Sequence, residues 1–251
     1  MPTAAGFSRH HRSRRVFLAM VCCAITTIAS APALRADDEW NDGRHGGKGY
    51  FMIGWSSLDL EPLNDVLVAN GYPTFTKDFM SLGGGGHAVI GRLVLGGQGH
   101  GYLSQAHDAT LPAGNYRTSV AGGAGFFDLG LLLWSRGATS FTPMVGLGGG
   151  GLELDIRELS SPTFSEVLAQ PGRRAKLHTG GFLVDLGASL DRIVDGGRGN
   201  GGPLVGIRAG WVLAPFPGHW QLHGQDVAGG PELGFTGPYV RFMFGGGGMG
   251  R

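Results

Sequence analysis

The spacing of strand-like segments is the feature that most constrains the fold of this chain. Eight segments have the apolar residues and the period of two expected of β-strands, at 48–60, 79–91, 92–104, 116–134, 140–157, 178–194, 203–215 and 237–246. The connections between them alternate: they are long at 61–78, 105–115, 158–177 and 216–236, and short at 91–92, 135–139 and 195–202. A membrane β-barrel has this alternation, because its turns are short on one side and its loops are long on the other.

Side-chain alternation within the segments agrees with a barrel that has an apolar outside. In segment 203–215, one face carries Val205, Ile207, Ala209, Trp211 and Leu213, and the other carries Gly206, Arg208 and Gly210. In segment 178–194, Phe182, Val184, Leu186, Ala188 and Leu190 oppose Asp185, Gly187, Ser189 and Asp191. The sequence therefore predicts an all-β fold, an eight-stranded antiparallel up-and-down membrane barrel with short periplasmic turns and long external loops. Residues 61–70 could form one or two short helical turns inside the first long connection.

The layout of residues 48 to about 248 resembles the small eight-stranded outer-membrane barrels of the OmpA/OmpX type. The last strand-like segment contains Tyr239-Val-Arg-Phe-Met-Phe244, with the expected alternation, and glycine-rich residues follow it. The resemblance implies contact with outer-membrane lipid and insertion by the barrel-assembly machinery. It also implies long loops that could bind a surface ligand.

The N-terminus has the pattern of an export signal over residues 1–33. A basic head with Arg14 and Arg15 precedes a mostly apolar stretch, and small residues at 29–33 fit a cleavage site. Residues Ser13–Leu18 resemble the motif of the twin-arginine export route, but an ordinary secretory signal is favoured. A polar segment at 34–47, the barrel at 48–248 and a tail at 249–251 would follow, in the outer membrane of a Gram-negative-type cell.

Both cysteines, Cys22 and Cys23, lie in the expected signal. The mature chain would therefore have no disulfide, no thiol nucleophile and no cysteine-ligated zinc. The net charge of +1 gives no electrostatic footprint for nucleic acid. No cofactor and no metal are expected.

Four charged residues fall on the predicted lumen faces, namely Asp128, Asp185, Arg208 and Arg241. An unpaired buried charge is costly, so these groups need partners. Because eight strands leave an interior that side chains can fill, we expect a charge-paired plug. The alternative is a selectivity ring or gate.

Two histidines, His87 and His100, are also placed in the lumen. If Gly91 and Arg92 form a tight turn, His87 lies opposite Gly96 and His100 opposite Gly83. The two histidines are then about 13 Å apart along the strands, too far to share one metal ion. We expect each to be an ordinary hydrogen-bonded lumen residue.

Glycine is unusually frequent, with 49 residues, and many stand inside predicted strands, where glycine is normally unfavourable. Folding the chain at its connections predicts that Gly84 faces Gly99, Gly86 faces Gly97, Gly97 faces Gly123, Gly123 faces Gly151, Gly125 faces Gly149, and Gly54 lies near Gly85. A patch on one wall would result, made of Gly84, Gly86, Gly97, Gly99, Gly123, Gly125, Gly149 and Gly151. The favoured role is sharp curvature, so that valine at Gly97 or Gly123 should impair closure while Gly224 tolerates it. The alternative is a smooth outer groove for a lipid chain or partner strand.

Catalytic candidates are weak, because nothing in the sequence fixes a nucleophile, a base and an orienting acid together. Some barrels of this size modify lipid A with a histidine, a serine and an acid. The candidates here are His178-Thr179 with Glu153 or Asp155, and Ser104 near His107-Asp108. The leading interpretation is a non-enzymatic outer-membrane barrel with a filled lumen and a structural or surface-binding role. The alternatives are a lipid A-modifying enzyme and a soluble periplasmic lipocalin-like binder of a small apolar ligand.

Overall fold

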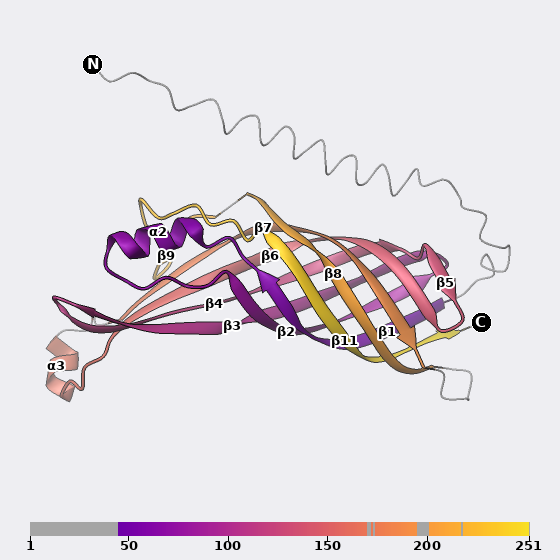
Figure 1. Ribbon diagram of the computed structural model, residues 1–251, viewed down its shortest axis with the longest axis horizontal. Helices are drawn as coiled ribbons and strands as arrows, with labels where there is room; N and C mark the ends of the chain where they lie inside the picture. Colours follow the sequence, from indigo (N-terminus) through magenta and orange to yellow (C-terminus); the bar gives the residue numbers. More distant parts are fainter. Residues whose placement is uncertain (1–44, 170–171, 173, 195–200, 217, 251) are drawn as a thin grey trace, which may run out of the picture. The chain divides into compact units, whose positions relative to one another are not determined.

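The structure, a computed structural model, is an antiparallel barrel closed by its first and last strands (Figure 1). It describes residues 45–169, 172, 174–194, 201–216 and 218–250. The eight barrel strands are β1 (His45–Ser57), β2 (Asp78–Ile90), β3 (Leu93–Leu111), β4 (Gly114–Leu131), β6 (Thr139–Glu158), β7 (Arg174–Ile193), β8 (Gly202–Phe216) and β11 (Gly237–Gly250). Each pairs antiparallel with the next, and β11 returns to β1. This confirms the all-β, eight-stranded antiparallel fold.

Five smaller elements lie in the connections. They are the helices α2 (Glu61–Ala69) and α3 (Phe164–Ala169) and the strands β5 (Trp134–Arg136), β9 (Gln221–Leu222) and β10 (Gln225–Asp226). Helix α2 is the one expected in the first long connection. Both helices and β9 lie toward one end of the barrel, which we call the loop end, and β5 lies at the other (Figure 1). Within the described part of the chain, neither helix has the length and apolar character needed to cross a membrane.

Three expected boundaries differ from the structure. The connection expected at 105–115 is mostly strand, because β3 continues to Leu111 and β4 begins at Gly114. Strand β11 continues to Gly250, so residues 249 and 250 belong to the sheet and not to a tail. Strand β1 begins at His45, inside the expected polar segment. The expected export signal at 1–33, and the polar segment as far as residue 44, lie outside the described residues.

Four neighbouring strands are much longer than a membrane crossing requires. Strands β3, β4, β6 and β7 have 19, 18, 20 and 20 residues, against about 9–11 for a tilted transmembrane strand. Their excess length forms a sheet extension at the loop end. Leu63 and Leu67 of α2 and Trp220 of the last long connection pack in one buried cluster with Leu152 and Leu154 of β6. The helix and the connection therefore cover the inner face of the extension.

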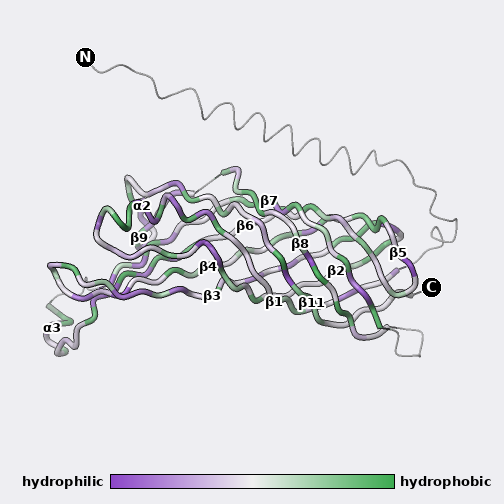
Figure 2. The backbone as a smooth tube through the Cα atoms, in the orientation of Figure 1, coloured by the Kyte–Doolittle hydropathy of each residue, from purple (hydrophilic) through white to green (hydrophobic). Residues whose placement is uncertain are grey.

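The polarity of the barrel is inverted relative to a soluble protein. Large apolar side chains are exposed on its outer wall, among them Phe51, Leu82, Phe127, Leu129, Leu147, Leu190, Val205, Trp211, Phe242 and Phe244. The lumen holds Asp128, Asp185, Arg208 and Arg241, each with a relative exposure of 0%. Figure 2 shows apolar residues recurring along the barrel strands and hydrophilic stretches along the hairpin that reaches toward α3.

The expected exposure fails at one place on the outer wall. Val184 was expected to point outward with Phe182, but its exposure is only 3%, as for the neighbouring Leu183 at 0%. The pairing of β7 with β8 shifts register between Phe182 and Val184, which is the signature of a β-bulge. Val184 pairs with the outward-facing Leu147 of β6, so it stays on the outer face, and the extra residue of the bulge lies on β8 between Leu213 and Phe216.

The predicted register is correct where a tight turn fixes it. Gly91 has a φ of 60° in the turn between β2 and β3, and the predicted pairs Gly84–Gly99 and Gly86–Gly97 follow from it. The pairs Gly123–Gly151 and Gly125–Gly149 are also found.

Two register predictions are wrong. Gly97 pairs with Phe127 and not with Gly123, because β3 and β4 extend to a turn at 112–113 and contain an irregularity between Tyr102 and Gln105. Gly54 pairs with Ser81 and not with Gly85.

The seam that closes the barrel is rich in glycine on both sides. Strand β1 contributes Gly46, Gly47 and Gly49, and β11 contributes the run 245–248. Gly47 pairs with Gly248 and Gly49 with Gly246. This part of the seam has few cross-strand side-chain contacts, which normally add to the stability of paired strands.

Candidate functional site

The lumen contains a buried ionic cluster centred on Arg208 of β8. Its guanidinium donates to both carboxylates: Nη1 lies 2.9 Å from Asp128 Oδ2 and Nη2 lies 2.8 Å from Asp185 Oδ2. The Tyr239 hydroxyl also donates to Asp185 Oδ2, at 3.0 Å. Three of the four predicted lumen charges therefore meet in one bonded group.

Neighbouring polar residues extend this cluster. His87 Nε2 lies 2.9 Å from Asp128 Oδ2, and the Tyr50 hydroxyl lies 3.0 Å from His87 Nδ1. The Gln98 amide nitrogen donates to Asp185 Oδ2 at 2.9 Å. Nearer the end of the barrel opposite the loops, Lys48 forms an ion pair with Asp191. Side chains thus fill the lumen at two levels.

The fourth predicted charge, Arg241 of β11, forms no ion pair with a carboxylate of the described residues. Its Nη2 donates to His100 Nε2 at 2.9 Å, and its Cζ lies 3.9 Å from the centre of the Tyr239 ring. The expectation that all four charges pair is therefore wrong for Arg241. His100 also lies 3.2 Å from the Tyr102 hydroxyl.

The predicted glycine patch lies on the outside of the barrel. Its eight glycines alternate with buried inward residues such as Gln98, His100 and Phe126. Gly84, Gly99, Gly125 and Gly149 form one row across four strands. Wherever the barrel spans a membrane, this row would face lipid.

The catalytic candidates are not assembled. His178 is exposed and lies 3.5 Å from Glu153, but adjacent residues of a strand point to opposite faces, and the Thr179 hydroxyl donates inward to the Gly218 carbonyl. Ser104 donates to the Gln105 carbonyl, and Asp108 pairs with Arg117. Across the described residues, no group of three or more His, Cys, Asp or Glu is placed to hold a metal ion.

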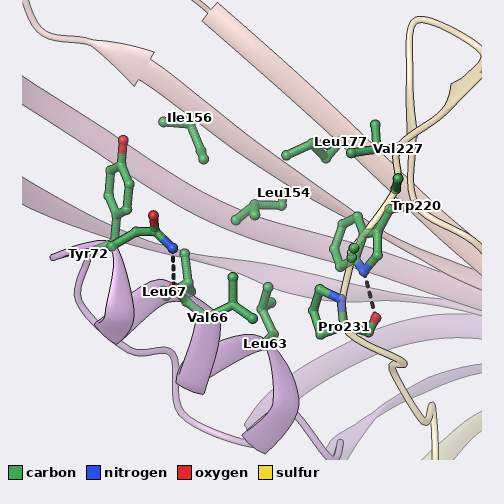
Figure 3. A pocket seen from close by; sticks show the side chains of 14 residues that line it. Leu63, Val66, Leu67, Tyr72, Leu154, Ile156, Leu177, Trp220, Val227 and Pro231 are labelled. Carbon is green, nitrogen blue, oxygen red and sulfur yellow. Dashed lines mark hydrogen bonds between the residues drawn. The ribbon is translucent and has the colours of Figure 1, made fainter.

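A distinct apolar pocket lies at the loop end, between α2, the extended strands and the last long connection (Figure 3). Its volume is about 240 Å³. The walls are mostly aliphatic and come from three regions: Leu63, Val66 and Leu67 of α2; Leu154, Ile156 and Leu177 of β6 and β7; and Trp220, Val227 and Pro231 of the connection. Leu63, Leu67, Leu154 and Trp220 have exposures of 2–4%, so the surrounding core fixes these walls.

Few polar groups line the pocket. Trp220 Nε1 donates to the Pro231 carbonyl at 2.8 Å, which satisfies the indole and orients its ring. Tyr72 lies at the opposite side of the pocket from Trp220 (Figure 3). Burial raises the pKa of the Tyr72 hydroxyl above its usual value, with a contribution from Tyr116, so this group stays neutral. The pocket therefore suits an uncharged apolar molecule with at most one hydrogen-bonding group.

Sequence reasoning missed this pocket. Its walls come from segments more than 150 residues apart in the sequence, since Leu63 and Trp220 line the same pocket. The short helix was expected, but its partner surface has no local signal. The lumen partners Tyr50, Gln98 and Lys48 could have been found from the alternation of inward positions.

Comparisons with known proteins find only distant structural similarity. No protein-family model matches the chain, and no curated protein matches it. Among solved structures, the chain is similar to Ail, the attachment invasion locus protein of Yersinia pestis, solved alone and with the heparin analogue sucrose octasulfate. Identities are 10% and 9%, TM-scores 0.35 and 0.40, and each match covers 83% of this chain and 99% of that one. The fold assignment above rests on this chain's own strand pairing.

Proposed function

We propose that this chain is a non-enzymatic outer-membrane barrel, sealed by its own lumen side chains, that binds a small apolar ligand at its loop end. The observation that carries the membrane assignment is an apolar outer wall around an ionic interior. Phe51, Phe127 and Phe244 have exposures of 79%, 60% and 52%, while Arg208 has none. A soluble protein would pay heavily for exposing that belt to water.

The binding role is supported by the loop-end pocket. At about 240 Å³ it lies just below the size range of drug-sized ligand sites, which is roughly 300–1,000 Å³. It suits one aromatic ring or a short alkyl chain. The layer formed by Arg208, Asp128 and Asp185 is fully buried, so we expect that ions do not pass through the lumen.

We expect the folded protein to stay with the membrane fraction through washes in high salt, and to be released by detergent. The apolar belt requires an apolar partner, whether lipid or detergent. Cell fractionation followed by gel electrophoresis of unboiled and boiled samples measures both localisation and barrel closure. Release by salt alone would contradict the membrane assignment and favour the soluble lipocalin-like alternative.

The pocket is tested by two substitutions on one helix. Val66 lines the pocket and Val68 does not, and both are substantially exposed, at 41% and 58%. Val66→Trp should fill the pocket and weaken binding of p-cresol at least tenfold, whereas Val68→Trp should leave binding unchanged. Methyl NMR of Leu63 and Leu154 during p-cresol titration in lipid nanodiscs measures the affinity.

The two variants must also fold equally well, which the same spectra report. If p-cresol leaves the Leu63 and Leu154 methyl signals unmoved in the unsubstituted protein, or if both variants bind alike, the pocket is not the binding site.

A further inference from the structure

The side chain of Arg241 runs along the inner wall of the barrel, from β11 past β1 and β2 to β3. It starts on β11 and passes over Gly54 of β1, where its Cγ lies 2.9 Å from the position that a Cβ on Gly54 would take. It ends beside His100 of β3, to which Nη2 donates. Glycine at position 54 therefore makes room for the arginine, and the guanidinium is fully buried.

Several buried donors in this layer have no hydrogen-bond partner. They include Nε and Nη1 of Arg241 and the hydroxyls of Ser56 and Ser81. Gly54 pairs with Arg241 on one side and with Ser81 on the other, so Ser81 lies along the path of the arginine side chain. Ser56 is the next inward residue of β1, and its exposure is 2%.

The nearby carboxylates bind other cations, although Asp185 Oδ1 and Asp191 Oδ1 have no hydrogen-bond partner. Arg208 holds Asp128 and Asp185, and Lys48 holds Asp191. His100 accepts from Arg241 through Nε2, so its remaining ring nitrogen, which also has no partner, would carry a proton and act as a further donor. Leaving a buried charged donor unsatisfied is costly.

We propose that Arg241, Ser56 and Ser81 hold one monovalent inorganic anion of chloride size inside the barrel. An anion accepts from every donor around it. A water molecule would not supply the counter-charge that Arg241, which has no carboxylate bonded to it, lacks. This anion site is separate from the loop-end pocket. It is also separate from the Arg208 cluster, whose guanidinium is already paired with carboxylates.

The test compares unfolding of the full-length protein in detergent micelles in sodium chloride and in sodium gluconate at constant ionic strength. Above the dissociation constant, the ratio of folded to unfolded protein should rise tenfold for each tenfold rise in chloride. Ser81→Ala should shift this dependence to higher chloride, and Arg241→Met should abolish it. Arg174→Met, on the outer surface, should retain it.

A direct test is diffraction from crystals grown in bromide. An anomalous peak beside the Arg241 guanidinium supports the site, and water density alone there overturns it. Equal unfolding midpoints in chloride and gluconate would also overturn it. If Arg241→Met does not fold, the comparison of the unsubstituted protein with Ser81→Ala still decides.

Discussion

Replacing Arg208 with leucine is expected to lower the free energy of unfolding by about 3–5 kcal/mol, the scale for removing one partner of a buried ion pair. The substitution strands two carboxylates, because Asp128 and Asp185 both bind this guanidinium. It also removes a donor that lies 3.3 Å from the Tyr239 hydroxyl. Urea unfolding in detergent, followed by tryptophan fluorescence, measures the change.

Two further variants show whether burial is the cause. Arg174 also binds an aspartate, Asp155, but its side chain is 53% exposed, so Arg174→Leu should leave the free energy of unfolding nearly unchanged. Converting both Asp128 and Asp185 to asparagine in the Arg208→Leu background should recover part of the loss. Unchanged unfolding of Arg208→Leu would mean that water reaches these charges and that the lumen is not plugged.

The second large effect is expected at Gly148, an inward-facing glycine of β6. A Cβ there would lie 1.9 Å from the Gly125 carbonyl oxygen, which is backbone and cannot move aside cheaply. Gly148→Ala should cost about 3 kcal/mol, the upper part of the usual range for overpacking, and should lower the folding yield. The difference in gel mobility between unboiled and boiled samples measures that yield.

The neighbouring Gly149 provides the control. It faces outward, and its Cβ would lie 3.4 Å from the Gly181 carbonyl oxygen, close to ordinary contact. Gly149→Ala makes the same chemical change in the same strand and should fold normally. Equal behaviour of the two variants would show that the bend of the wall does not depend on inward glycine.

This contrast changes the interpretation of the glycines. The sequence placed eight of them in one patch and assigned curvature to it, but the tightest contacts belong to inward glycines outside that patch. A Cβ on Gly83 or Gly96 would lie 2.2 or 2.1 Å from a backbone oxygen, against 3.8 Å at the patch residue Gly99. Within the patch, Gly123 at 2.9 Å is tighter than Gly97 at 3.2 Å, so valine should be worse at Gly123.

The fold could be predicted from the sequence because period and turn chemistry are local. Asp185 and Arg208 were assigned to the lumen by alternation alone, and Gly91 fixed the register of β2 against β3. The register of β3 against β4 was missed mainly because the two strands extend to a turn at 112–113, inside the stretch expected to be a loop, and the irregularity after Tyr102 shifts the pairing by one residue. The bulge between β7 and β8, beside the buried Val184, has no local signal.

The candidate sites were less predictable than the fold. Asp128 reaches Arg208 across the lumen from β4, whereas Asp185 comes from the neighbouring strand β7, and no period in the sequence encodes the crossing from β4. The apolar pocket requires α2 and the segment around Trp220 to cover one sheet extension. Both arrangements depend on contacts between segments that are distant in the sequence.

The glycine-rich seam between β1 and β11 has a consequence for the order of folding. Its partners are far apart in the sequence, as with Tyr50 and Gly245, so joining them carries the largest loop-closure entropy in the barrel. Hairpins such as β2–β3 form between near neighbours. Where glycine meets glycine, backbone hydrogen bonds must offset the entropy of closure with little help from side chains. The barrel should therefore assemble as a curling sheet from β2 to β8, with its two terminal strands meeting last.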